Sequence, residues 1–186
     1  MTEAPRVLIL PGYQNSGPEH WQSLWEERHP EYRRVHQRDW EYPRRADWVA
    51  GLDEAVQAEP AAVVFVAHSL GCVTVAHWAA RHVHEVAGAL LVAPPDIERP
   101  DALSDVRDFA PIPLAPLPFP SIVVASTDDP FADFERARAW ASAWGSRLVS
   151  LGPAGHINAS AGFGPWPAGE ALLAPLMAWP SSMARA

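Results

Sequence analysis

Ser69 is the residue whose surroundings most clearly indicate a reaction. It follows the apolar run 61–67 and precedes 70–82, a stretch of small and apolar residues with helical character. A buried strand, a tight turn and a helix in this order lift a serine hydroxyl onto the rim of a parallel sheet. A serine held in this way can attack an acyl carbon and form a covalent ester, so the pattern predicts acyl transfer to water.

The neighbours of Ser69 fit a strained turn. Small residues are needed two positions away on either side, where Gly71 meets the need and Ala67 replaces the more common glycine with one extra methyl group. The amide of Leu70, at the start of the helix, is the expected first donor to a negative tetrahedral intermediate. The alternative is a serine that merely caps a buried helix. The apolar strand before it and the small residues after it favour the strained turn.

A nucleophilic serine needs a base, and the base needs an acid that orients it. The order expected along the chain is serine, acid, histidine, with acid and histidine in loops after strands. Asp128 and Asp129 follow the apolar run 121–126, and His156 follows the run 147–151. Either aspartate could instead stabilise the start of the next helix, and His156 could be a solvated loop residue. Three candidates in the expected order are more specific than any one alone, because ligands of open α/β sheets bind at this edge.

The loop after the first predicted strand, 11–21, is expected to complete the site. Gly12 permits close backbone approach, and the amide of Tyr13 is the expected second oxyanion donor. Side chains of the same loop are candidates for the pocket wall, namely Gln14, Asn15, His20 and Trp21. The run 15–18 is also a strong turn signal, so its polar residues could serve only the turn.

The remaining histidines and the cysteine indicate no metal site. Their spacings match no histidine or cysteine motif for metal binding, and we expect neither a metal nor a cofactor. The ring of His68 is expected to point away from Ser69, into a hydrogen bond beneath the turn. His20 precedes the serine along the chain, which is the wrong order for the base. Cys72 is the only cysteine and is expected to pack as a small residue in the helix.

Alternating strands and helices must position these residues. Strands are predicted from apolar runs at 6–10, 61–67, 87–93, 121–126 and 147–151, and a weaker strand is predicted at 33–38, where Val35 is the only strongly apolar residue. Helices are predicted at 19–28, 47–58, 70–82, 131–144 and 167–178. The continuous apolar character of the central strands is typical of a parallel sheet covered on both faces. The pattern therefore predicts a three-layer α/β architecture with 1–186 as a single domain.

The stretch 94–120 departs from this alternation. It contains eight prolines and shows no strong periodicity. It could form a short helix near 101–107 that walls or covers the site, or it could be a connection across the sheet edge. We slightly favour the connection, because loops of this length are common in enzymes without acting as lids.

Composition and charge restrict the function classes. The chain has 186 residues, of which 48% are hydrophobic, and a formal net charge of −8. An acidic chain is a poor candidate for binding nucleic acid or an anionic membrane, and no apolar run reaches membrane-spanning length. The first residues show no secretory signal pattern, and a lone cysteine fits a reducing compartment, so we expect a cytoplasmic protein.

Four motifs together resemble the small serine hydrolases related to retinoblastoma-binding protein 9. The motifs are 10–21, 67–71, 126–131 and 155–158. The likeness extends from Val7 to about Leu173. It implies a compact α/β-hydrolase core with six parallel strands, no large cap and a Ser–Asp–His triad. Matched residue by residue, it puts the nucleophile on Ser69 and the base on His156. It puts the acid on Asp129, the aspartate directly before a proline.

The residues and the resemblance together predict a serine hydrolase that cleaves a carboxylic ester, with amides and thioesters as less favoured substrates. The expected partner is a small acyl substrate, with no nucleic acid and no membrane. No protein partner is inferred, because the chain contains no retinoblastoma-binding signature. The alternative is a binding protein that keeps the hydrolase fold, since fold does not imply function.

Overall fold

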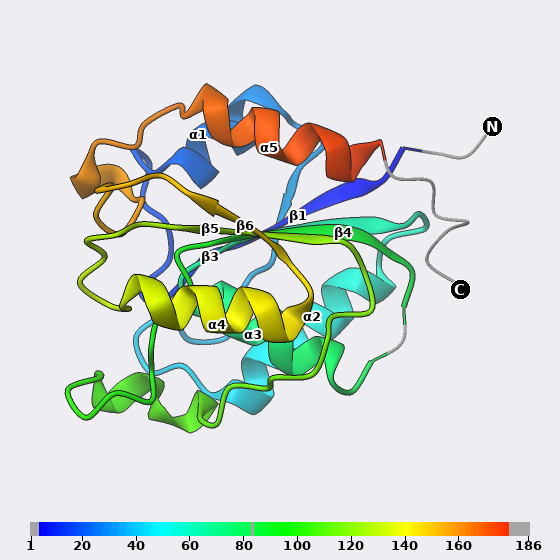
Figure 1. Cartoon of the computed structure of the whole chain (residues 1–186). Helices are drawn as coiled ribbons and strands as arrows, with labels where there is room; N and C mark the ends of the chain where they lie inside the picture. Colours follow the sequence, from blue (N-terminus) through cyan, green and yellow to red (C-terminus); the bar gives the residue numbers. More distant parts are fainter. Residues whose placement is uncertain (1–3, 83, 179–186) are drawn as a thin grey trace.

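Parallel strands form the middle layer of the molecule (Figure 1). The computed structural model describes residues 4–82 and 84–178, and within these the sheet has six strands. The strands are β1 (Arg6–Leu10), β2 (Arg33–Arg34), β3 (Val63–His68), β4 (Val86–Val92), β5 (Ser121–Ala125) and β6 (Arg147–Ser150). They pair in the order β2-β1-β3-β4-β5-β6, and every pair is parallel. The predicted α/β-hydrolase core with about six parallel strands and no large cap is confirmed.

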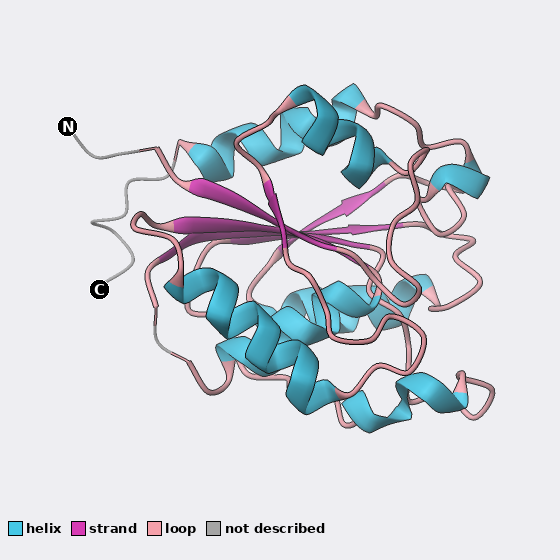
Figure 2. Cartoon of the chain, turned by 180° about the vertical axis from the view of Figure 1, so that it is seen from behind, coloured by secondary structure: helices cyan, strands magenta, loops and turns pink. Residues whose placement is uncertain are grey.

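Helices cover both faces of this sheet, as Figures 1 and 2 show. One face carries α1 (Trp21–Arg28) and α5 (Pro167–Met177). The other face carries α2 (Arg45–Gln57), α3 (Leu70–Ala79) and α4 (Phe134–Trp144). Two short 3-10 helices, η1 (Ser104–Phe109) and η2 (Ala159–Ala161), lie in the connections after β4 and β6. Within the described part of the chain, no helix combines the length and apolar character needed to cross a membrane.

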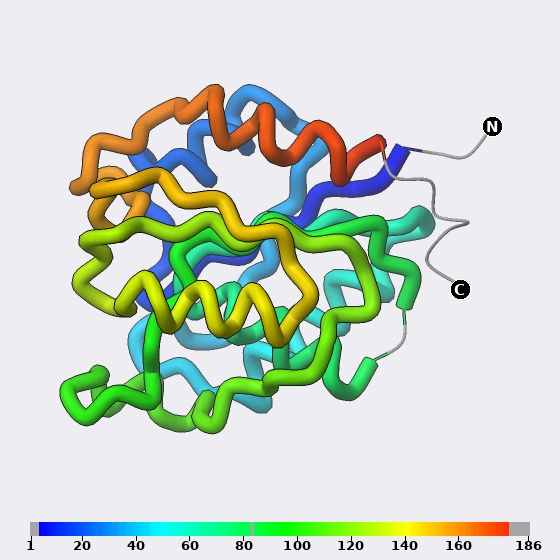
Figure 3. The backbone as a smooth tube through the Cα atoms, viewed as in Figure 1, coloured from blue at the N-terminus to red at the C-terminus, as the bar shows by residue number. Residues whose placement is uncertain are grey.

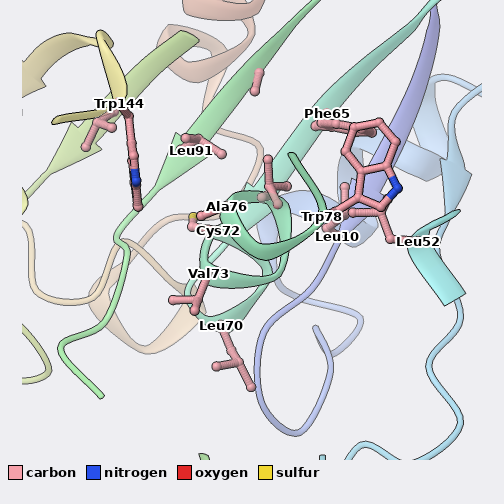
Figure 4. Close-up of a cluster of buried hydrophobic side chains, with 14 of the residues drawn as sticks. Leu10, Leu52, Phe65, Leu70, Cys72, Val73, Ala76, Trp78, Leu91 and Trp144 are labelled. Atoms are coloured by element: carbon pink, nitrogen blue, oxygen red, sulfur yellow. The ribbon is translucent and has the colours of Figure 1, made fainter. Parts of the chain in front are cut away.

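Two hydrophobic clusters join the layers, one on each face of the sheet. The larger cluster contains Trp48 of α2 and Trp78 of α3, and Figure 4 shows Trp78 beside Phe65 of β3. The smaller cluster contains Trp25 of α1 and lies toward α5. β3 and β4 are buried along their whole length, so their alternating side chains enter both clusters. Each fully buried large side chain contributes about 1.5–3 kcal/mol to stability, which fixes the strands that carry the site.

Several predicted boundaries differ from the observed ones. A strand is predicted over 33–38, but β2 covers only Arg33–Arg34, although the amide of Val35 still donates to Ile9 O at 2.9 Å. A helix is predicted from residue 131, but α4 begins at Phe134 because Asp133 is its extended N-cap. The helix after Ser69 is predicted to residue 82, and α3 ends at Ala79.

Parallel strands deliver the loops that follow them to one end of the sheet. Figure 3 shows the segments after β4, β5 and β6, in green, yellow-green and orange, gathered at this end. The stretch 94–120 leaves β4 there, forms η1 three residues later than the predicted start of a short helix at 101, and returns to β5. Residues distant in sequence therefore meet at the carboxyl ends of the strands.

Candidate active site

Ser69 occupies a strained backbone conformation between β3 and α3. Its φ is 54° and its ψ is −124°, a combination that non-glycine residues rarely adopt and that costs on the order of 1–3 kcal/mol. Its amide donates to Val92 O at 2.9 Å, and its carbonyl accepts from the amide of Cys72 at 2.9 Å. The hydrogen bonds to β4 and α3 hold the turn, so the hydroxyl is presented at the end of the sheet.

Small residues allow this turn to approach β1. A Cβ at Gly71 would lie 2.4 Å from Leu10 O, and a Cβ at Gly12 would lie 2.7 Å from Ser69 Cβ. Both positions therefore exclude a side chain. Ala67, where a glycine is more common, lies fully buried in β3, and its methyl group packs in the larger cluster.

His156 connects Ser69 to a carboxylate. The Ser69 hydroxyl donates to His156 Nε2 at 2.9 Å, and His156 Nδ1–H donates to Asp129, 2.9 Å from Oδ2 and 3.0 Å from Oδ1. The side chains of His156 and Asp129 are 10% and 4% exposed, so the hydrogen bond between them is shielded from water. The structure thus brings the three predicted residues into one hydrogen-bonded chain.

Asp128, adjacent in sequence, has a different environment. Its Oδ1 accepts from Ser126 Oγ at 2.7 Å and from the amides of Ala154 and Gly155 at 2.8 Å. The hydrogen bond from Ser126 and those from the two amides lower the pKa of Asp128. Asp128 therefore fastens the loop after β6 to the end of β5, whereas Asp129 contacts His156 directly.

Two side chains hold the backbone of the His156 loop. His68 Nε2–H donates to His156 O at 2.9 Å, and Trp21 Nε1–H donates to Ile157 O at 2.9 Å. Ile157 has a φ of 48°, so the two hydrogen bonds stabilise a strained position. Burial and the neighbouring His156 and His20 keep the pKa of His68 well below its ordinary value, so His68 is neutral. The expected orientation of His68, away from Ser69 and into a hydrogen bond, agrees with this contact.

The prediction that Trp21 lines the pocket is wrong. Trp21 is fully buried in the smaller cluster and does not reach the cavity. It packs at ring-centroid distances of 4.7 Å from Trp25 and 5.1 Å from Trp166. Its large apolar surface gains more from the core than from a solvent-facing wall, and its N–H finds a carbonyl there.

The loop after β1 is held by a buried glutamine that the motif analysis missed. Gln22 Nε2 donates to Leu10 O at 3.1 Å and to Val66 O at 3.0 Å, and Gln22 Oε1 accepts from Ser16 Oγ at 2.6 Å. Gln14 and Asn15 both have positive φ, at 62° and 65°. The turn predicted at 15–18 is not observed there, because the turns of this loop are closed by hydrogen bonds from the amide of Asn15 to Gly12 O and from the amide of His20 to Gly17 O. Gln22 fixes the loop to the ends of β1 and β3.

Two backbone amides at the cavity, those of Tyr13 and Leu70, are the predicted oxyanion donors. Tyr13 and Leu70 both line the cavity, and among the described residues neither amide donates to a protein acceptor. Leu70 is the first residue of α3, where amides have no partner within the helix. The Tyr13 hydroxyl donates to Asp105 Oδ2 at 3.2 Å, which directs the side chain toward η1 and leaves the amide free.

A cavity of about 470 Å³ opens beside Ser69. It is lined by Gly12, Tyr13, Gln14, Asn15, His20, His68, Ser69, Leu70, Pro95, Asp96, Ile97, Arg99, Asp101, Ala102, Leu103, Val106, Pro130, Phe131, His156 and Asn158. The predicted wall residues Gln14, Asn15 and His20 are among them. The sequence did not decide whether 95–106 lines the cavity. The only sequence feature that favoured this role was the position of the segment directly after a central strand. This stretch is both the connection to β5 and a wall of the cavity.

The remaining histidine, cysteine and carboxylate side chains were compared with metal and thiol sites. The described residues contain no group of three His, Cys, Asp or Glu side chains able to hold a metal ion. Cys72 is buried in α3 with its Sγ 3.4 Å from Val92 O, and burial raises the pKa of its thiol. A thiol that stays protonated is a poor nucleophile.

Comparison with known proteins agrees with this geometry. A family model described as serine hydrolase matches residues 7–175. The chain belongs to the serine hydrolase family. The resemblance to small serine hydrolases related to retinoblastoma-binding protein 9 is consistent with this family. A search of curated proteins found no match.

Several solved structures resemble this member of the serine hydrolase family. A protein described as a YdeN-like hydrolase from Pectobacterium atrosepticum is 36% identical, with a TM-score of 0.85 over 94% of this chain and 91% of that one. The ydeN gene product of B. subtilis is 21% identical, with a TM-score of 0.73 over 94% and 99%. The esterase RhEst1 from a Rhodococcus species is 13% identical, with a TM-score of 0.67 over 95% and 92%, and shares the fold alone.

Proposed function

We propose that the protein hydrolyses carboxylic esters through an acyl-enzyme formed on Ser69. The observation that carries the proposal is the 2.9 Å hydrogen bond from the Ser69 hydroxyl to His156 Nε2, with Asp129 on the opposite ring nitrogen. A serine is a weak nucleophile unless a base removes its proton during attack, and a neutral imidazole at this distance can do so.

In the first half-reaction, Ser69 Oγ attacks the ester carbonyl and His156 accepts the hydroxyl proton. Asp129 stabilises the imidazolium and keeps the ring in the orientation that faces Ser69. The amides of Tyr13 and Leu70 donate to the oxyanion of the tetrahedral intermediate. His156 then gives the proton to the leaving alcohol, and the acyl group remains on Ser69.

In the second half-reaction, water takes the place of the alcohol. His156 removes a proton from the water, which attacks the acyl carbon, and the carboxylic acid leaves as the proton returns to Ser69. The preference for esters over amides follows the names of structural neighbours, among them the carboxylesterase from Bacillus cereus and the esterase RhEst1. Because these share only the fold at 18% and 13% identity, the substrate class is part of our proposal.

A fluorophosphonate probe tests the activated serine directly. We expect the wild-type protein to be labelled, and Ser69→Ala and His156→Ala to remain unlabelled. Hydrolysis of short-chain p-nitrophenyl esters by the wild type alone would extend the result to turnover. A folded wild-type protein that is neither labelled nor active would overturn the proposal and favour a binding role.

A further inference from the structure

The cavity beside Ser69 has two chemically different walls. One wall, which we call the apolar wall, consists of Ile97, Leu103 and Val106. The other, which we call the donor wall, consists of Asn15, His20 and Asn158. The chain has only two asparagines, and both line this cavity.

The oxygen and the nitrogen of the Asn15 side-chain amide have unambiguous positions. Its Oδ1 accepts from the amide of Ser16 at 2.8 Å and from Arg34 Nη1 at 2.9 Å. Only an oxygen can accept from a backbone N–H, so the assignment of oxygen and nitrogen does not depend on a choice of flip. Among the described residues no acceptor takes a hydrogen bond from Asn15 Nδ2. The group that Asn15 leaves for a ligand is therefore a donor.

Asn158 repeats this arrangement on the loop that carries His156. Its Oδ1 caps η2 by accepting from the amide of Ala161 at 3.1 Å, and it also accepts from Ser160 Oγ at 2.9 Å. Its Nδ2 likewise has no acceptor in the described part of the chain. The side-chain oxygens of both asparagines thus accept hydrogen bonds from the protein, whereas their Nδ2 groups are available to donate to a ligand.

His20 adds a third donor of fixed sense. Its Nδ1 accepts from the amide of Gln22 at 3.2 Å, as the N-cap of α1. Burial, with smaller effects of Arg34 and His156, lowers the pKa of His20 to about 4, so the ring is neutral and its proton lies on Nε2. Nε2 is buried and has no partner among the described residues, and the residue as a whole is only 7% exposed. Leaving such a donor unsatisfied costs about 1–3 kcal/mol, which an acceptor in the cavity would offset.

The donor wall adjoins the ring that delivers a proton to the leaving group. The ring centroids of His20 and His68 are 4.7 Å apart, and those of His68 and His156 are 4.8 Å apart. Asn158 follows His156 by two residues. Phe131 also contacts the His156 ring, with ring centroids 4.6 Å apart. The alcohol part of an ester must lie next to His156, because His156 protonates its oxygen.

We propose that the donor wall binds an accepting oxygen, such as an ether, carbonyl or hydroxyl oxygen, in the alcohol part of the ester, while the apolar wall receives the acyl chain. This inference rests on the proposed ester hydrolysis. It assigns the substrate class as esters of oxygen-bearing alcohols with an apolar acyl group. Gln14 also lines the cavity but does not belong to the donor wall, because its Nε2 already donates to Glu41 at 3.0 Å.

Two esters of equal size test the assignment. Butyl butanoate and 2-methoxyethyl butanoate differ by one ether oxygen in the alcohol, and release of butanoic acid can be followed by titration at constant pH. After division by the uncatalysed alkaline rates, we expect wild-type kcat/KM to favour the methoxyethyl ester by about five- to tenfold, the value of one or two neutral hydrogen bonds.

Variants of Asn158 connect that preference to the donor wall. Asn158→Asp keeps the oxygen that caps η2 and replaces the donor with a second oxygen, and Asn158→Ser keeps a capping oxygen without adding charge. Both should reduce the preference to about twofold or less. Because the readout is a ratio of two substrates in the same variant, a general loss of activity or folded protein does not change it.

A second pair of esters, with the ether oxygen in the acyl part, decides which part of the ester is recognised. Butyl pentanoate and butyl 3-methoxypropanoate carry the same difference in the acyl chain, and we expect no preference for the ether here. A preference in the acyl pair instead, or a wild-type ratio that Asn158→Asp leaves unchanged, would overturn the inference while ester hydrolysis stands. Absence of hydrolysis of all four esters by a protein that cleaves p-nitrophenyl esters would overturn this inference alone, whereas absence of both activities and of fluorophosphonate labelling would overturn the proposed function as well.

Discussion

The two walls of the cavity are held in place in different ways. On the donor wall, the loop after β1 is tied to the strand ends by Gln22, and the asparagine oxygens are bound by backbone amides. On the apolar wall, hydrogen bonds also tie the segment 95–106, such as the one from the amide of Asp96 to Phe131 O at 2.9 Å. The side chains of this wall, however, pack only by apolar contact, with Ile97 and Val106 buried and Leu103 50% exposed. The groups that must be positioned for chemistry lie on the side fixed by hydrogen bonds. The groups that need only exclude water are apolar side chains that form no hydrogen bonds themselves.

The largest effect is expected at the residues proposed for catalysis, where the two adjacent aspartates should differ in their effect on kcat. Asp129→Asn should lower kcat by about 10⁴, because His156 loses the partner that sets its tautomer and stabilises its charge. Asp128→Asn should lower kcat less than about tenfold, because an amide oxygen can still accept from the amides of Ala154 and Gly155. Steady-state kinetics of both variants on a p-nitrophenyl ester is the measurement. A larger loss in Asp128→Asn would contradict the assignment of the acid.

Close backbone contact at the strained turn predicts the next effect. Gly71→Ala should destabilise the fold by about 3 kcal/mol or more, because the new Cβ would lie 2.4 Å from Leu10 O, which is backbone and cannot rotate away. Gly17→Ala, in the loop after β1, is the matched control because no atom lies within 4 Å of its Cβ position. Denaturant unfolding of the two variants should separate them, and equal stabilities would refute the steric argument.

The buried histidine of the donor wall predicts a pH dependence of stability. The pKa of His20 falls from 6.5 to about 4 on folding, so the unfolded chain binds a proton that the folded chain excludes. The stability that this difference provides is complete above pH 6.5 and is lost as the pH falls toward 4, by up to about 3 kcal/mol. His68 acts in the same direction. Unfolding free energies of wild type and His20→Ser between pH 7 and 4 should show the smaller decline in the variant, and identical declines would contradict the prediction.

A smaller effect should follow from loosening the loop of His156. Trp21→Phe removes the donor to Ile157 O, and we expect kcat to fall about tenfold with KM nearly unchanged. Trp25→Phe is matched to it, because Trp25 Nε1–H donates to Pro165 O at 2.8 Å, farther along the same connection. Both should lose about 1–2 kcal/mol of stability, but only Trp21→Phe should lose turnover. Equal kcat values in the two variants would mean that the Trp21 contact supports only the fold.

The smallest effect is expected at the apolar wall. Leu103→Ser should change stability by less than about 0.5 kcal/mol, because the side chain is half exposed. It should lower kcat/KM for longer acyl chains about two- to fivefold, since part of the apolar contact is lost. Leu114→Ser is the control, because Leu114 is 57% exposed and lies outside the cavity. If both variants behave alike on a series of acyl lengths, Leu103 is not a substrate contact.

The sequence predicts the sheet well because its central strands are continuous apolar runs that only a doubly covered parallel sheet can bury. The order of Ser69, the aspartates and His156 follows from the same sheet, since each comes after a strand. The choice of Asp129 over Asp128 depended on resemblance, because two adjacent carboxylates differ only in which loop atoms they meet. Trp21 was misplaced and Gln22 missed because packing and hydrogen-bond partners more than forty residues away leave no local pattern. The bounds of the short helix within 94–120 could not be predicted either, because the prolines interrupt the hydrophobic periodicity that marks a helix.

The segment between β4 and β5 supplies much of the cavity wall, yet none of the hydrogen-bonded residues Ser69, His156 and Asp129 lies within it. Its two ends are anchored in neighbouring strands of the central sheet. Exchange of this segment between relatives would therefore alter which molecules are accepted without moving the reacting atoms. Selection for a new substrate, in nature or in the laboratory, can act there while the residues proposed for catalysis are inherited unchanged.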